Sequence, residues 1–211
     1  MQTPKTHNSS SADPVKVDAE RDQAPHCFAA GTKIATVRGE VAVQDLQAGD
    51  IVLTMDSGLK PIQWIGGREV SGLGKFAPIR FQAGAIGNVR DLVVSPMHRI
   101  LVRGLKANPG FGESEMLVPA RQLVDGDQII IDPVDRVEYF HILFDQHELV
   151  FSDGAATESF YPGAKVLRED VALRLELQTL FPGLFSPEAE GFSQTARLVV
   201  DYPDAAAQRA A

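Results

Sequence analysis

The chain has 211 residues, 44% hydrophobic and 23% charged, which is enough for a sizeable core in one domain with a small appendage. Its single cysteine excludes an internal disulfide framework and a zinc site of several cysteines. The net charge of −8 argues against a broad affinity for nucleic acid, and no apolar run reaches the roughly 20 residues that span a membrane, so we expect neither kind of partner.

Residues 1–26 are expected to form a disordered leader. They are polar, contain no aromatic residue, and cannot bury enough apolar surface to offset the entropy of ordering. The leader also lacks the apolar stretch of a secretory signal, so we expect the chain to be cytoplasmic when it is synthesised.

From residue 27 to residue 163 the sequence predicts one all-β domain. Short apolar runs are separated by turn residues, as in IVLTM before DSG and QIII before DPVD. Residues 33–37 and 137–142 alternate apolar and polar side chains with the period of a half-buried strand. Many short strands with Gly and Pro between them are typical of an all-β fold.

An internal repeat divides this β region into two related halves. Residues 41–51 read VAVQDLQAGDI, and residues 118–128 read VPARQLVDGDQ. Val, Leu, Gly and Asp recur at the same four positions, and an apolar strand follows each copy. Two copies are too few for a solenoid, but they fit two β subdomains related by a pseudo-two-fold axis. The alternative is that LxxGD is merely a common turn before a strand.

The last part of the chain, residues 164–211, is expected to be a helical and irregular extension. Apolar residues in 164–181 recur mostly three or four positions apart, which predicts an amphipathic helix, and Pro182 with Gly183 ends it. The remaining tail contains one candidate short element, at residues 196–200.

Cys27 stands where the polar leader meets the first predicted strand. A lone intracellular cysteine is usually a buried apolar residue without a chemical role. At this position, however, its thiolate can attack the carbonyl group of the preceding peptide bond, between His26 and Cys27. This N-to-S acyl shift converts the amide into a thioester, and it needs a general acid that protonates the leaving nitrogen.

The segment VSPMHR, residues 94–99, can supply that acid. Ser95 and His98 lie three positions apart around a proline that sets a turn, so both can face one bond. The hydroxyl of Ser95 would hydrogen-bond the backbone near the junction, and the imidazole of His98 would donate to the leaving nitrogen. The alternative is a surface turn with an incidental histidine.

Two further histidines, His141 and His147, lie on or beside late predicted strands, close to Asp145 and Glu148. These residue types can ligate a metal, but a spacing of six residues matches no strong ligand pattern, so we expect no metal. Histidines satisfied within the core or at its rim are the alternative. The thiol step itself needs no cofactor.

Together these segments resemble the Hint domains, the module shared by inteins and Hedgehog autoprocessing domains. The opening block is similar to residues 27–34 and 43–52, the Thr-x-x-His block to residues 95–98 with Ser in place of Thr, and the late block to residues 147–154. The signatures Ser-Pro-x-His-Arg, Val-Pro-Ala and Glu-Ser-Phe-x-Pro-Gly resemble a bacterial Hint subfamily. The resemblance covers residues 27–163 and implies an all-β horseshoe of two pseudo-symmetric subdomains.

The resemblance also implies roles for single residues. It makes Cys27 the nucleophile, gives Ser95 and His98 the role of the Thr-x-x-His block, and assigns the late histidine to His147. The sequence leaves open whether His141 or His147 carries that last role. No cofactor and no metal is implied.

The departures from the family indicate cleavage without splicing. An intein cyclises a C-terminal Asn, but the last Asn of this chain is Asn108, and Glu158 with Ser159 stands near the expected His-Asn pair. Residues 64–68 lack the Asp with which Hedgehog domains assist sterol transfer.

The leading hypothesis is therefore autocatalytic cleavage of the bond between His26 and Cys27. The chain's own N-terminal peptide is the substrate, and the thioester passes to water or to a small external nucleophile. One alternative is a Hint-fold module that binds partners or supports folding without cleaving. Another is a Cys/His hydrolase that acts on other molecules.

Overall fold

The structure is a computed structural model, and it describes residues 26–103, 115–162, 171–180 and 194–200. Over these residues the chain forms a six-stranded and a nine-stranded sheet, which confirms the all-β class. The smaller sheet consists, in spatial order, of β11 (Ile129–Ile131), β7 (Ile79–Phe81), β8 (Leu92–Val94), β1 (Phe28–Ala29), β12 (Val134–Leu143) and β6 (Trp64–Gly72). The larger sheet consists of β15 (Leu198–Val199), β10 (Glu115–Pro119), β9 (Arg99–Arg103), β14 (Ala155–Glu158), β13 (Leu149–Ser152), β2 (Lys33–Thr36), β4 (Ile51–Thr54) and β5 (Gly58–Pro61), with β3 (Gly39–Ala42) beside β2.

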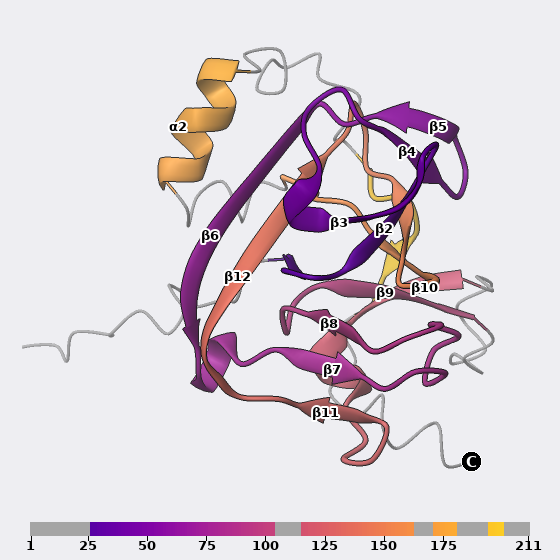
Figure 1. Cartoon of the computed structure of the whole chain (residues 1–211), viewed down its shortest axis with the longest axis vertical. Coiled ribbons are helices and arrows are strands. Elements are labelled where there is room, and N and C mark those ends of the chain that lie inside the picture. The colour runs from indigo at the N-terminus through magenta and orange to yellow at the C-terminus, as the bar shows by residue number, and fades with distance from the viewer. Residues whose placement is uncertain (1–25, 104–114, 163–170, 181–193, 201–211) are drawn as a thin grey trace, which may run out of the picture.

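The two longest strands, β6 and β12, form an antiparallel ribbon. It is paired from Trp64 with Leu143 to Gly72 with Val134, and its register shifts once, between Val134 and Arg136. Figure 1 shows the ribbon curving along one side of the molecule, from β5 near one end to β7 and β11 at the other. A one-turn 3-10 helix, η2 (Gly74–Phe76), follows β6. The short strand β1 pairs with β12 on one side and with β8 on the other, so the residue that precedes β1 is held from both sides.

One hydrophobic core is shared by the two sheets. Phe28, Phe81 and Leu92 of the smaller sheet and Ile34 and Val150 of the larger sheet are at most 1% exposed and belong to one cluster. Full burial of an apolar side chain of this size stabilises a fold by about 1.5–3 kcal/mol. The cluster therefore packs β1, a strand of the smaller sheet, against the larger sheet.

The two copies of the sequence repeat have the same local structure. Each contains a one-turn 3-10 helix, η1 (Val43–Asp45) in the first copy and η3 (Ala120–Leu123) in the second. Each then turns at a glycine in the left-handed region, Gly49 with a φ of 92° and Gly126 with a φ of 81°. A short strand follows, β4 or β11, and later a long one, β6 or β12. The element order thus agrees with two related β halves.

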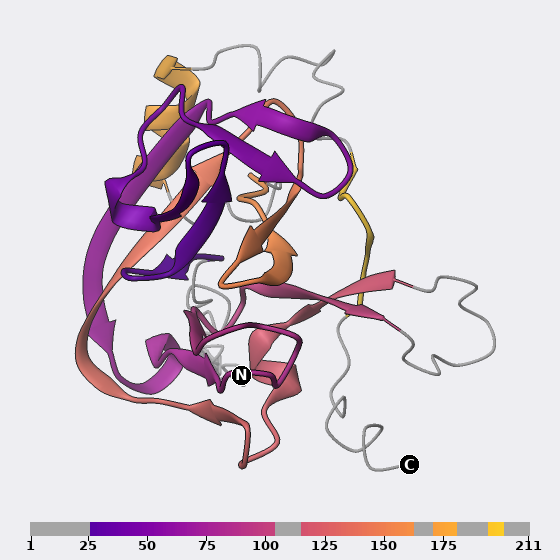
Figure 2. The same ribbon diagram turned by 45° about the vertical axis from the view of Figure 1, so that its right-hand side comes forward.

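The described part of the C-terminal extension contains the helix α2 (Val171–Leu180), which agrees with the helix expected over residues 164–181. Its Leu177 is fully buried, whereas Leu175 is about half exposed. The helix lies beside β6 in both views (Figure 1, Figure 2). The remainder of that predicted helix, residues 164–170 and 181, lies outside the described residues.

Two further expectations concern the ends of the chain. The predicted leader falls almost wholly on residues 1–25, which the structure does not describe. The short element expected at residues 196–200 is β15, which pairs in parallel with β10. Residues 186–193 and 201–211, expected to be irregular, also lie outside the described residues.

Candidate active site

Cys27 immediately precedes β1 and is fully buried. Its backbone N–H donates a hydrogen bond to Ser95 Oγ over 2.8 Å. Its carbonyl oxygen accepts a second bond from the Ser95 N–H over 3.0 Å. The pairing of Phe28 with Val94 explains this contact, because one step back along β1 and one step forward from β8 bring Cys27 opposite Ser95. Ser95 therefore holds the amide nitrogen of the bond between His26 and Cys27.

His141 lies on the other side of Cys27. The pairing of Phe28 with Phe140 places the next residue of β12, His141, opposite Cys27. Its Nε2 is 3.2 Å and its Nδ1 3.5 Å from Cys27 Sγ. Its Nδ1 is also 3.0 Å from the carbonyl oxygen of His26. One imidazole thus contacts both the thiol and the carbonyl group of the adjacent peptide bond.

The hydrogen-bond pattern assigns the tautomer of His141. A carbonyl oxygen only accepts hydrogen bonds, so Nδ1 carries the hydrogen and Nε2 is left to accept from the thiol. Burial, with a smaller effect from the charge of Arg68, lowers the pKa of His141 to about 3. The ring is therefore neutral near neutral pH, which is the state that this pair of contacts requires.

His98 lies in the turn between β8 and β9 and is 1% exposed. Its ring packs edge-on against Phe28, with 4.4 Å between the ring centroids. Neither ring nitrogen has a hydrogen-bond partner among the described residues. Burial lowers the pKa of His98 to about 3, although the charge of Glu158 acts in the opposite direction. His98 is thus a neutral buried imidazole, packed on the residue that follows Cys27, with unused hydrogen-bonding capacity.

A second polar cluster surrounds Glu158 at the end of β14. Its Oε1 accepts hydrogen bonds from His26 Nδ1 over 2.8 Å and from the Arg99 N–H over 2.9 Å. Its Oε2 accepts from Arg99 Nη1 over 2.9 Å and lies 3.3 Å from His147 Nε2, a contact with poor hydrogen-bond alignment. Burial opposes the ionisation of Glu158, but the cationic and donor groups around it outweigh burial and hold its pKa well below the usual range.

The sequence-predicted candidates therefore fall into two groups. Cys27, Ser95 and His98 lie together around β1. His147 belongs to the Glu158 cluster, and its Nδ1 accepts a hydrogen bond from the Ala196 N–H over 2.9 Å. The histidine that contacts Cys27 is His141.

The family assignment follows from a comparison with protein families. A family model described as Hint domain matches residues 26–164, which is more than half of the chain. This chain belongs to the Hint domain family. The Hint-type fold implied by the sequence motifs is thereby confirmed, and the match begins at His26, the residue before the candidate nucleophile.

Solved structures with a similar fold include inteins and an intein-like domain. The bacterial intein-like domain from Clostridium thermocellum is 20% identical, with a TM-score of 0.44 over 65% of this chain and 100% of that one. The gp41-1 intein is 14% identical, with a TM-score of 0.41 over 62% of this chain and 96% of its own. The DnaB intein from Synechocystis is 10% identical, with a TM-score of 0.41 over 64% and 98%. No match is found among curated proteins.

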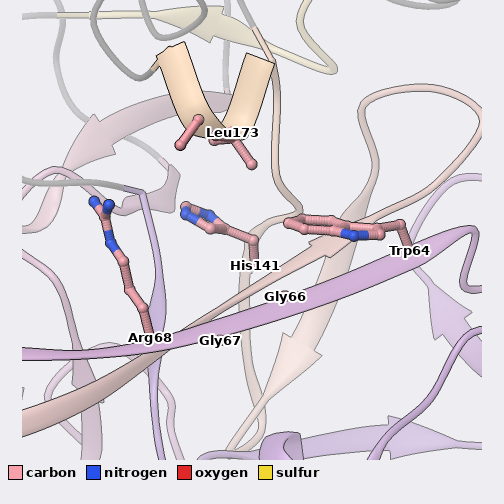
Figure 3. A pocket seen from close by; sticks show the side chains of 7 residues that line it. Trp64, Gly66, Gly67, Arg68, His141 and Leu173 are labelled. Atoms are coloured by element: carbon pink, nitrogen blue, oxygen red, sulfur yellow. The ribbon is translucent and has the colours of Figure 1, made fainter. Parts of the chain in front are cut away.

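A pocket of about 180 Å³ adjoins His141 in this Hint domain. Trp64 and Arg68 of β6, His141 of β12 and Leu173 of α2 line it (Figure 3). The His141 ring stacks against Trp64 at 6.4 Å between centroids and packs against Phe160 at 4.4 Å. The C-terminal helix thus contributes one wall of a pocket whose polar side chains are His141 and Arg68.

The described residues contain neither a candidate metal centre nor a membrane-spanning helix. No group of three or more His, Cys, Asp or Glu side chains there is arranged to hold a metal ion. No described helix combines the length and the apolar character needed to cross a membrane.

Proposed function

We propose that this Hint domain cleaves its own chain at the bond between His26 and Cys27 through an N-to-S acyl shift. The observation that carries the proposal is the position of His141, which contacts Cys27 Sγ and the His26 carbonyl oxygen at once. Such a ring can act as a base towards the thiol and as a hydrogen-bond donor to the oxygen that gains negative charge.

The steps of the shift balance within this set of residues. The S–H proton passes to Nε2 of His141, and the thiolate attacks the carbonyl carbon of His26. The carbonyl oxygen becomes an oxyanion that faces the Nδ1–H of His141. The C–N bond then breaks, and the nitrogen of Cys27 takes up one proton, which equals the one that left the thiol. His98 is the candidate relay: one ring nitrogen accepts the proton that His141 gives up while the other donates its own to the leaving nitrogen, which returns both rings to the neutral state. Neither His98 nitrogen has a hydrogen-bond partner among the described residues.

The thioester on Cys27 is then resolved by water or by a small nucleophile, which releases residues 1–26. The pocket of about 180 Å³ beside His141 is large enough to admit water or a small nucleophile. The end of β14 supports cleavage without splicing. Glu158 and Ser159 carry no amide that could cyclise, and Ser159 Oγ instead accepts a hydrogen bond from the Glu148 N–H over 2.9 Å.

The test is the intact mass of freshly expressed full-length protein, with and without hydroxylamine or excess thiol. We expect the wild type to lose residues 1–26 faster when either reagent is added, because both attack a thioester. The variant Cys27→Ala should remain intact under the same conditions. If the wild type also stays intact with hydroxylamine, the proposal is wrong, and the domain is a Hint scaffold that does not cleave.

A further inference from the structure

The Glu158 cluster has no part in the acyl shift described above, yet it contacts the residue whose carbonyl group is attacked. Glu158 is fully buried and has four polar partners among the described residues. The Arg99 N–H, the Arg99 guanidinium and the ring of His147 belong to the folded domain. The fourth partner, the ring of His26, belongs to the peptide that the reaction would release.

The folded domain supplies part of the charge compensation that this buried carboxylate needs, and His26 supplies the rest. A buried carboxylate requires compensation, and Arg99 supplies a full positive charge at 2.9 Å. The His147 ring approaches the second oxygen from another side, with Nε2 at 3.3 Å from Oε2. The oxygen Oε1 accepts one hydrogen bond from the Arg99 N–H of the folded domain and a second from His26.

His26 is held at two points. Its side chain donates from Nδ1 to Glu158 Oε1 over 2.8 Å, and its carbonyl oxygen accepts from His141 Nδ1 over 3.0 Å. Side-chain rotation is removed at the first point and the carbonyl orientation is fixed at the second. Holding a reacting group in an attack geometry is one of the larger sources of rate enhancement available to an enzyme.

We propose that Glu158, oriented by Arg99 and His147, forms a subsite that selects histidine as the residue immediately before the scissile bond. The inference rests on the proposed self-cleavage and names the substrate side chain for it. Glu158 is a positioning residue here, because it acts on the carbonyl carbon through the His26 side chain. The chemistry of the subsite favours a side chain that donates a hydrogen bond at this reach and disfavours an apolar or acidic one.

The subsite accounts for three features that the acyl shift leaves without a role. These are the Glu of the ESFYPG segment, the Arg that follows His98, and the late histidine His147. Glu158 accepts hydrogen bonds from both the main-chain N–H and the guanidinium group of Arg99. The late histidine would then serve recognition of the leader.

The experiment measures the rate at which hydroxylamine releases residues 1–26 from the full-length chain, by intact mass. We expect His26→Gln, which keeps an N–H donor, to remain the fastest variant at residue 26. His26→Leu should be about 10-fold to 100-fold slower than the wild type, because it leaves a buried acceptor with one bond fewer. His26→Glu should be slowest, because it places a second carboxylate against Glu158. Gln23→Leu, in the same leader, serves as the matched control and should cleave at the wild-type rate.

A charge exchange separates recognition from a merely structural role. In the His26→Glu background, Glu158→Gln should raise the cleavage rate at least several-fold, whereas in the wild-type background the same substitution should lower it. A loss of folding cannot produce opposite effects of one substitution. Thermal unfolding of each variant checks that the domain is intact.

The outcomes distinguish this inference from the proposal on which it rests. A wild type that hydroxylamine does not cleave overturns the self-cleavage itself. A wild type that is cleaved, with His26→Leu and His26→Glu cleaved equally fast, overturns the subsite alone. The same holds if Glu158→Gln slows both backgrounds to the same degree.

Discussion

At the scale of single residues, one imidazole contacts both the thiol of Cys27 and the carbonyl group of His26. His141 faces the thiol with Nε2 and the carbonyl oxygen with Nδ1–H, and the aromatic rings of Trp64 and Phe160 fix its orientation. Because burial keeps the ring neutral, the same tautomer serves both contacts. A protonated ring would lose the acceptor that the thiol needs.

The first prediction separates the two late histidines. His141→Gln should slow hydroxylamine-induced release of the leader by about 100-fold or more, because general acid–base groups typically contribute that much or more. His147→Gln should slow it by less than His141→Gln does, because His147 contacts Glu158 and not the thiol. Equal losses in the two variants, with both folded by circular dichroism, would contradict this division.

The second prediction concerns Ser95. Its hydroxyl accepts the Cys27 N–H in a fully buried place, so Ser95→Ala leaves a buried donor without this partner. We expect the free energy of unfolding to fall by about 1–3 kcal/mol. Urea denaturation in a Cys27→Ala background measures it without interference from cleavage. The control Ser71→Ala, at an exposed position of β6, should leave the stability unchanged.

At the scale of elements, the register of β1 decides which side chains meet. Local motifs mark Cys27, Ser95 and His98, so these three could be chosen from the sequence. The choice between His141 and His147 could not be made there, because it depends on Phe28 pairing with Phe140, a contact between distant parts of the chain. Strand alternation describes β12 but does not say which partner strand lies beside it.

The role proposed for Glu158 could not be predicted from the local sequence either. The sequence shows a glutamate at the start of the ESFYPG segment, but not that its side chain contacts His26 and Arg99. The domain repeat was accessible, by contrast, because Gly49 and Gly126 mark turns that need a left-handed backbone and therefore recur in the sequence itself.

The third prediction tests the strand that forms the floor of the pocket. A Cβ atom at Gly66 would lie 2.2 Å from the Trp64 ring, so Gly66→Ala must displace that ring. We expect a loss of stability of about 1–3 kcal/mol, as for other overpacked sites. Trp64 is the single tryptophan of the chain, so its emission spectrum reports the displacement directly. Unchanged emission, with Ser71→Ala as the reference, would show that the ring is not held as described.

At the scale of the whole molecule, two buried neutral histidines couple folding to pH. The pKa values of His98 and His141 lie at about 3 in the folded state, chiefly because of burial. In the unfolded chain a histidine titrates near 6.5. Below about pH 6.5 the unfolded state therefore binds protons that the folded state does not, and stability falls as the pH falls towards 3.

The fourth prediction follows from this linkage. Between pH 6 and pH 4, the free energy of unfolding should decrease by on the order of 1 kcal/mol per pH unit for each of the two histidines. His98→Gln should remove about half of that slope. Urea denaturation of the Cys27→Ala protein at several pH values measures it. A slope that His98→Gln leaves unchanged would mean that His98 is protonated in the folded state.

The strand order has a consequence for the order of events during synthesis. The contacts around the bond between His26 and Cys27 join residues 68, 114 and 132 positions apart, from Cys27 to Ser95, from Cys27 to His141 and from His26 to Glu158. At a translation rate of about 5–20 residues per second, His141 and Glu158 are synthesised on the order of ten seconds after His26 and Cys27. Under the proposed function, Cys27 of the nascent chain is therefore inert until β12 and β14 have been made. The strand order therefore delays cleavage until the late strands have been synthesised. A chain truncated before β12 would keep its leader attached.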